Sequence, residues 1–255
     1  MHRAGLLTAI HVPDEATEAV RDLCRARHDL DDDLKRVCRR LLAFLLRQGR
    51  VYRSGSTWTV AHHAWLAKQF FEDPAPRATF GYYLSVVKVR EAELAAIDRE
   101  VRGWVDREPF ADAAHRLAAY HAVGYLGGLS IAVEVGEWRR FASAPAFMAF
   151  TGLVPSEYSS GGRRWQGSVT KTGNVVVRTQ LIESAWHYRH NAAPGRPLKE
   201  RQSHVGPDTV ARATVAHRRL STRYRRLAAR GKNPKLVTTA VARELAGFRW
   251  AEMTS

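Results

Sequence analysis

The sequence has little cysteine and no long apolar run. Cys24 and Cys38 are the only cysteines in 255 residues, and they do not form a C-x-x-C pair. A disulfide framework and a zinc site built from cysteines are therefore excluded. No stretch approaches the ~20 apolar residues of a membrane-spanning helix, and the short apolar segment 5–12 does not match a secretory signal. We expect a cytoplasmic protein.

Acidic residues are also scarce. The chain has 25 Asp and Glu against 40 Lys and Arg, so its formal net charge is +15 and its pI is near 10.5. Such an excess indicates a polyanionic partner, of which nucleic acid is the commonest. Only seven of the basic residues are Lys, and Arg favours bidentate contacts with phosphate. A GC-rich coding sequence would enrich Arg in the same way.

Common nucleotide and metal motifs are missing as well. The chain has no Walker A loop, no Rossmann fingerprint and no H-E-x-x-H. Glu183, His187 and His190 could share a helix face, but an ordinary ion pair explains the same spacing. The acids at 29–33 point around a helix, which is typical of a solvated face. We predict no metal site in this chain.

Two apolar heptad seams dominate the first half. One runs from Val20 to Phe44 after a candidate cap at Asp14, and the other runs from Leu84 to Trp104. The connection 49–76 is rich in turn and aromatic residues. These patterns predict an antiparallel, coiled-coil-like helix pair over residues 14–108, preceded by a short segment 1–13.

The second half, 109–255, reads as a helical domain. A helix at 111–120, a glycine-rich turn at 121–129 and an apolar run at 130–135 suggest a helix-hairpin-helix element. Its Gly124 would leave backbone N–H groups open to a phosphate, although ordinary helix pairs also use glycine turns. Further helices are expected at about 144–151, 175–190, 209–230 and 234–247, with a polar break at 191–208. The predicted fold class is mainly α.

Positive charge concentrates near the carboxyl end. Residues 196–235 hold twelve basic and two acidic residues. By their spacing, one face of the expected helix is shared by Arg219, Arg223, Arg226 and Arg230. A solvated charged face is one explanation. With so few acids between them these cations would repel one another, so a phosphate backbone is the better partner.

The irregular stretch 152–173 holds a candidate nucleophile. Ser159 and Ser160 precede two glycines, and Arg163, Arg164 and Lys171 follow. A serine hydroxyl with an approachable backbone and nearby cations could attack a phosphodiester. The alternative is a flexible loop whose cations only contact phosphate. It stays open because no His or Asp lies at a spacing that would mark it as the general base for the serine.

These segments resemble a known family. The stretches 150–162, 170–174 and 240–250 resemble the DEDD-type transposases of bacterial insertion sequences, which are bridge-RNA-guided DNA recombinases. The resemblance implies that Ser160 forms a covalent link to DNA, and that the heptad helices are the family's coiled coil. Residues 121–141 would be its helix-hairpin-helix segment, with Ala122 where the family usually has glycine.

The resemblance also implies parts that we do not find. The family carries an N-terminal RuvC-like domain whose four acids bind Mg²⁺, and nothing here matches them. Residues 1–13 would be a remnant of that domain, and the chain a truncated copy that needs Mg²⁺ only with the missing part. The implied partners are DNA, a guide RNA and further copies joined through the coiled coil. The alternatives are an inactive nucleic-acid-binding remnant that oligomerises, and a purely structural helical oligomer.

Overall fold

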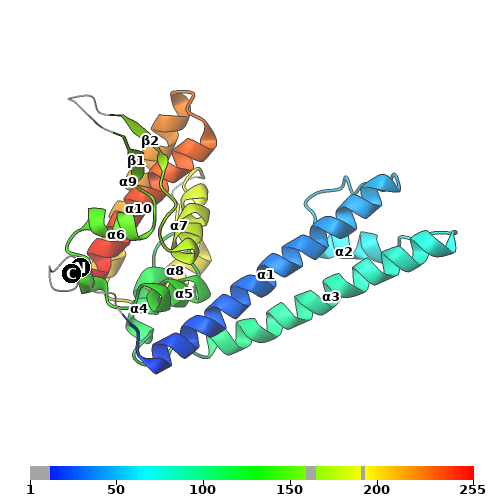
Figure 1. Cartoon of the computed structure of the whole chain (residues 1–255), viewed down its shortest axis with the longest axis horizontal. Helices are drawn as coiled ribbons and strands as arrows, with labels where there is room; N and C mark the ends of the chain where they lie inside the picture. Colours follow the sequence, from blue (N-terminus) through cyan, green and yellow to red (C-terminus); the bar gives the residue numbers. More distant parts are fainter. Residues whose placement is uncertain (1–11, 159–164, 191–192) are drawn as a thin grey trace. The chain divides into compact units, whose positions relative to one another are not determined.

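The structure, a computed structural model, describes residues 12–158, 165–190 and 193–255. Those residues form ten α-helices and one two-stranded sheet (Figure 1), so the predicted mainly α class is confirmed. The chain divides into two compact units, one made of residues up to Asp22 and from Val101 onward, the other of Leu23–Glu100. We call them unit 1 and unit 2. In the described residues no helix is long and apolar enough to span a bilayer.

Unit 2 contains most of two long antiparallel helices, α1 (Glu15–Arg47) and α3 (Pro74–Arg102) (Figure 1). As predicted, α1 starts after Asp14, whose carboxylate accepts a hydrogen bond from the Thr17 N–H at 2.8 Å. Gly49 follows the helix with a φ of +68°, a conformation that glycine adopts without strain.

Apolar residues of the two heptad seams pack together near the connection between α1 and α3. Val37, Leu41, Phe44, Phe80 and Val87 belong to one buried cluster. The connection between the helices contributes to it through α2 (Val60–Ala67), a helix that the turn-rich sequence did not indicate. Its apolar face is buried against the seam, and this burial stabilises so short a helix.

The charged residues on the surface of unit 2 form ion pairs with one another, as expected for a solvated helix face. Lys35 lies 2.7 Å from Asp31, and Arg36 lies 2.8 Å from Asp33. Arg27, which interrupts the first seam, lies 2.5 Å from Asp98 on α3. The interruption is therefore matched by an opposite charge on the facing helix.

Unit 1 is built around its last helix. It contains α4 (Ala111–Ala118), α5 (Tyr125–Val135), α6 (Ala144–Phe150), α7 (Val175–His187), α8 (Arg196–Gln202), α9 (Pro207–Ala229) and α10 (Pro234–Thr254), with strands β1 (Pro155–Glu157) and β2 (Gln166–Val169). Helix α10 packs against α4, α6, α7 and α9. Its Val241 and Leu245 are fully buried in the core.

Three predicted helix starts are confirmed by their caps. Ser143 accepts from the Ala146 N–H, Asn174 from the Val177 N–H, and Asn233 from the Lys235 N–H. In each case a side-chain oxygen satisfies an N–H group that the first helical turn leaves without a partner.

Three other expectations were wrong. Helix α10 continues past Gly247 to Thr254, because a glycine inside a helix costs only about 1 kcal/mol relative to alanine and the packing of α10 outweighs that cost. The polar break contains α8, whose Leu198 is buried. The irregular stretch contains the paired strands β1 and β2.

The α4–α5 hairpin is formed, but its turn is shorter than the glycines suggested. Helix α5 starts at Tyr125, so Gly127 and Gly128 lie inside it. A Cβ on Gly128 would lie 2.4 Å from the carbonyl oxygen of Ala114. That glycine therefore allows α4 and α5 to approach closely. Ala122, in the turn, has a φ of +62°, which costs a non-glycine residue about 1–2 kcal/mol.

We expect Gly128→Ala to lower the free energy of unfolding by about 2–3 kcal/mol, because its methyl group would force the two helices apart. Gly124→Ala should change it by less than about 0.5 kcal/mol, since a Cβ there meets nothing within 4 Å. Urea denaturation of both variants measures the difference. Equal losses would contradict this account of the two glycines.

Candidate functional site

The predicted serine loop rises from a fixed base. The Asn174 N–H donates to the Phe150 carbonyl at 2.8 Å, and the Thr170 N–H donates to the Val154 carbonyl at 2.9 Å. The two ends of the stretch 150–174 are thus held together by the main chain. The points at which the chain enters and leaves this stretch are therefore fixed.

Glycine and buried polar groups tighten this base. A Cβ on Gly173 would lie 2.0 Å from the Phe150 carbonyl oxygen, so only glycine fits there. Arg178 Nη1 donates to the carbonyls of Thr151 and Gly173 at 3.1 and 3.2 Å. Asn174 Nδ2 donates to the buried Glu134 of α5 at 2.7 Å. The base is therefore tied to α5 and α7 by hydrogen bonds.

Above the base the chain forms a β-hairpin. Strands β1 and β2 are antiparallel, with Pro155 opposite Val169 and Glu157 opposite Gln166, and an irregularity between them. The Tyr158 N–H donates to the Trp165 carbonyl at 2.9 Å.

Residues 159–164 join Tyr158 to Trp165. The predicted nucleophile Ser160 and the predicted phosphate contacts Arg163 and Arg164 belong to this segment, which lies outside the described residues. Their roles stay predictions.

Lys171 lies at the foot of the hairpin. It is exposed, and its backbone has a φ of +58°, a left-handed conformation that costs a lysine free energy. Its N–H donates to the Gly152 carbonyl at 3.1 Å. The ammonium group is thus free to reach a phosphate while the backbone closes the base of the loop.

A second cationic feature lies on α9. Arg219, Arg223 and Arg226, which the spacing placed on one face, line a groove of about 480 Å³ together with Arg218, Thr222 and Glu244 of α10. We call it the arginine groove. Glu244 forms ion pairs with Arg219 and with Arg223, the latter at 3.1 Å. The sequence did not reveal this acid between the cations, because α10 supplies it.

Gly124 caps α5 at an exposed position. Its φ and ψ are −90° and 174°, and a Cβ added there would have no atom within 4 Å. A larger residue would fit, so the turn does not require glycine here. Gly124 remains a candidate for backbone contact with phosphate.

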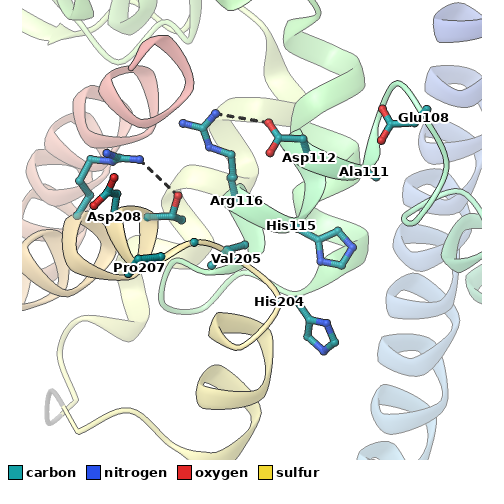
Figure 2. A pocket seen from close by; sticks show the side chains of 12 residues that line it. Glu108, Ala111, Asp112, His115, Arg116, His204, Val205, Pro207 and Asp208 are labelled. Atoms are coloured by element: carbon teal, nitrogen blue, oxygen red, sulfur yellow. Dashed lines mark hydrogen bonds and ion pairs between the residues drawn. The ribbon is translucent and has the colours of Figure 1, made fainter.

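Another cavity, of about 530 Å³, lies where α4 meets the α8–α9 connection (Figure 2). His115 Nε2 lies 2.7 Å from Asp106 Oδ1, and Arg116 pairs with Asp112 at 3.4 Å. Figure 2 shows His204 below His115 at the same wall. Acids and cations alternate around this cavity, so its lining favours neither an anion nor a cation.

No metal centre emerges from the part of the chain that the structure describes. It holds no group of three His, Cys, Asp or Glu side chains arranged to bind an ion. His187 and His190 have ring centroids 6.4 Å apart, and their carboxylate neighbour Glu183 completes no ligand set. The described residues do not fit the Mg²⁺ that the resemblance implies, and we derive no step through it.

A stacked pair of histidines, which the sequence did not reveal, lies between α9 and the α4–α5 turn. The rings of His121 and His217 have centroids 4.3 Å apart and planes 26° apart, and the buried Tyr188 ring contacts both. Burial, followed by repulsion from His217 and His187, lowers the pKa of His121 to about 4. Burial also lowers the pKa of His217.

This stack predicts a pH-dependent stability. The folded state disfavours a proton on His121 that the unfolded chain accepts near its ordinary pKa of about 6.5. Stability is therefore lost as pH falls from that value toward about 4, by about 2 kcal/mol between about pH 7 and about pH 4.5. His121→Phe, which keeps an aromatic ring in the stack, should flatten this slope in urea denaturation. An unchanged slope would contradict the assignment.

The segment that contains the β1–β2 hairpin is similar to known proteins. Residues 114–198, which include the hairpin and its base, match the family described as "Transposase IS116/IS110/IS902 family". The matched segment runs from within α4 to within α8, and so it contains Gly124, Lys171 and the segment with Ser160.

Similar proteins extend the likeness beyond the matched segment. The chain is 39% identical over 249 residues to a transposase, y4qE, of Sinorhizobium fredii, a match that covers 98% of this chain and 60% of that protein. It is 29% identical over 223 residues to the transposase of insertion sequence element IS1533 of Leptospira borgpetersenii, covering 84% of this chain and 63% of the relative. The chain therefore spans about three fifths of the length of these relatives.

Proposed function

We propose that this chain acts in the transposition of a bacterial insertion sequence, with Ser160 as the nucleophile that cuts and rejoins DNA. Residues 14–108 would serve as a coiled-coil arm and residues 109–255 as the domain that holds DNA. The observation that carries the proposal is the family match over residues 114–198, which contains the serine segment and its base.

The proposed chemistry needs no nucleotide. Ser160 Oγ loses its proton and attacks a phosphorus atom of the DNA backbone, forming a P–O bond to serine. The bond from phosphorus to one deoxyribose oxygen breaks, and that oxygen leaves and takes up a proton as a hydroxyl. A hydroxyl from another strand then attacks the phosphoserine and releases Ser160. The energy of the broken bond is kept in the phosphoserine link, so strand exchange is isoenergetic.

Cations stabilise the charge of this reaction in the proposal. Arg163, Arg164 and Lys171 flank the serine and would neutralise the five-coordinate phosphorus transition state. For Lys171 this role is supported by its backbone hydrogen bond at the base of the hairpin, because a cation held in place loses less free energy to reorganisation.

The arginine groove on α9 would hold flanking nucleic acid. Its exposed guanidinium groups suit phosphate oxygens. We propose that DNA and a guide RNA are the polyanions that bind this chain. We also propose that further copies of the chain associate through the coiled-coil arm.

A recombination assay tests the proposal. The purified chain is incubated with an intact donor, a target and the matching guide RNA, and the products are separated under denaturing conditions. Joined strands together with a protein–DNA adduct that survives denaturation support it. Salt-sensitive binding of DNA without adduct or joined strands overturns the catalytic part.

That second result would favour the other candidate function, a catalytically inactive nucleic-acid-binding module that oligomerises. The arginine groove supports it, because the groove needs neither Ser160 nor a metal ion to bind phosphate. Reversal of Arg219, Arg223 and Arg226 to Glu should then abolish binding. Binding that survives the triple reversal would contradict a role of the groove in either function.

Glu244 gives a sharper test of the arginine groove. Glu244→Gln removes the carboxylate that pairs with Arg219 and Arg223, so we expect DNA to bind about 3- to 10-fold more tightly at low salt. Asp112→Asn is the matched control, since it removes the same charge from the α4 surface. Equal effects of the two variants in fluorescence anisotropy would indicate net charge alone.

A further inference from the structure

Two exposed aromatic side chains flank the serine segment. Tyr158 is 75% exposed and Trp165 is 73% exposed. A large aromatic side chain buries about 150–250 Å² when it packs, so two of them exposed together offer a sizeable surface to a ligand. Both lie at the open end of the hairpin, one on each side of residues 159–164.

The hairpin sets these two residues opposite each other. The Tyr158 N–H donates to the Trp165 carbonyl at 2.9 Å, which continues the antiparallel pairing of β1 and β2. Residues directly opposite in an antiparallel pair project their side chains to the same face. The two rings therefore share one face of the hairpin.

Gly167 makes room for the Tyr158 ring on this face. Gly167 lies two residues after Trp165, and a Cβ at Gly167 would lie 3.5 Å from Tyr158 Cε2 and 2.5 Å from Ser156 Oγ. The Tyr158 ring therefore lies next to the glycine, and a larger residue there would displace its neighbours.

We propose that Tyr158 and Trp165 form a stacking platform for unpaired nucleobases next to the phosphate that Ser160 attacks. This inference rests on the proposed function and adds the recognition of single-stranded nucleic acid to it. Aromatic side chains stack on bases of any sequence because every base has a π-face.

The surroundings of the rings favour a base over an apolar protein segment. The arginines at 163 and 164 and the exposed Lys171 attract the phosphates that accompany bases.

The test uses the full chain carrying Ser160→Ala, so that no result depends on catalysis. The probe is a single-stranded DNA oligonucleotide with one 2-aminopurine, whose fluorescence falls when it stacks on an aromatic ring. We expect quenching on binding. Tyr158→Ala and Trp165→Ala should each weaken binding about 5- to 150-fold and reduce the quenching. Trp165→Phe should restore most of both.

Controls separate stacking from general damage. Tyr82→Ala removes an aromatic ring that is 65% exposed on α3 of unit 2 and should change neither readout. A fully paired duplex should lose little affinity in the alanine variants, because its bases already stack on one another.

Three outcomes would overturn the platform. They are affinity and quenching that stay at the parent level in both alanine variants, weaker binding without a change in quenching, and equal losses for single-stranded and duplex DNA. A failed recombination assay with intact quenching would refute catalysis and leave the platform standing. Successful recombination without quenching would support catalysis and refute the platform.

Discussion

Ser160→Ala should abolish recombination, with a loss of at least about 10³-fold in rate, if the hydroxyl is the nucleophile. Alanine removes only the oxygen, so binding of DNA should stay within about 2-fold of the parent chain. The covalent protein–DNA adduct should disappear together with the joined strands. Gel separation of labelled DNA after denaturation measures both products.

Ser159→Ala is the matched control, since the two serines are neighbours in the same segment. It should retain the adduct. Activity that survives Ser160→Ala but not Ser159→Ala would transfer the role to the first serine. Activity that survives both would refute a serine nucleophile in this segment.

Glu252→Gln should cost about 3–5 kcal/mol of unfolding free energy, because it removes the buried charge that holds two arginines. The Glu252 carboxylate is fully buried on α10, 2.8 Å from Arg116 Nε and 2.6 Å from Arg212 Nε. Thr209 donates a further hydrogen bond at 2.7 Å. Burial raises the pKa of Glu252, but these hydrogen bonds outweigh it, so the pKa lies below its ordinary value.

Asp112→Asn provides the comparison within the same network. Asp112 pairs with the same Arg116, but its side chain is 74% exposed and the distance is 3.4 Å. Exposed pairs contribute about 0–1 kcal/mol, so this variant should keep nearly its full stability in urea. Similar losses in the two variants would show that burial does not set the strength of these pairs.

The sequence predicted the features that depend on neighbours along the chain. The heptad spacing from Val20 to Phe44 specified a long helix and the cap at Asp14 specified its start. The starts near 144, 175 and 234 were also predicted from local sequence. Both signals are local, since capping and helical periodicity act within one or two turns. The face shared by Arg219, Arg223 and Arg226 followed from the same periodicity.

Features that depend on distant contacts could not be predicted in this way. Gly247 looked like a helix end, whereas it lies within α10, which the packing of unit 1 stabilises beyond that position. Glu244 joins the arginine groove from another helix, and the His121–His217 stack joins residues 96 positions apart. No local pattern marks such contacts, because each arises only when the helices pack.

The sequence by itself determined a basic, mainly helical protein and the candidate residues of its serine segment. The tertiary structure decided how the base of that segment is held, which acid lies among the arginines, and that Tyr158 and Trp165 face solvent together across a hairpin. The physical reason is that charge and helical period are properties of a segment. Burial and strand pairing are properties of the packed chain.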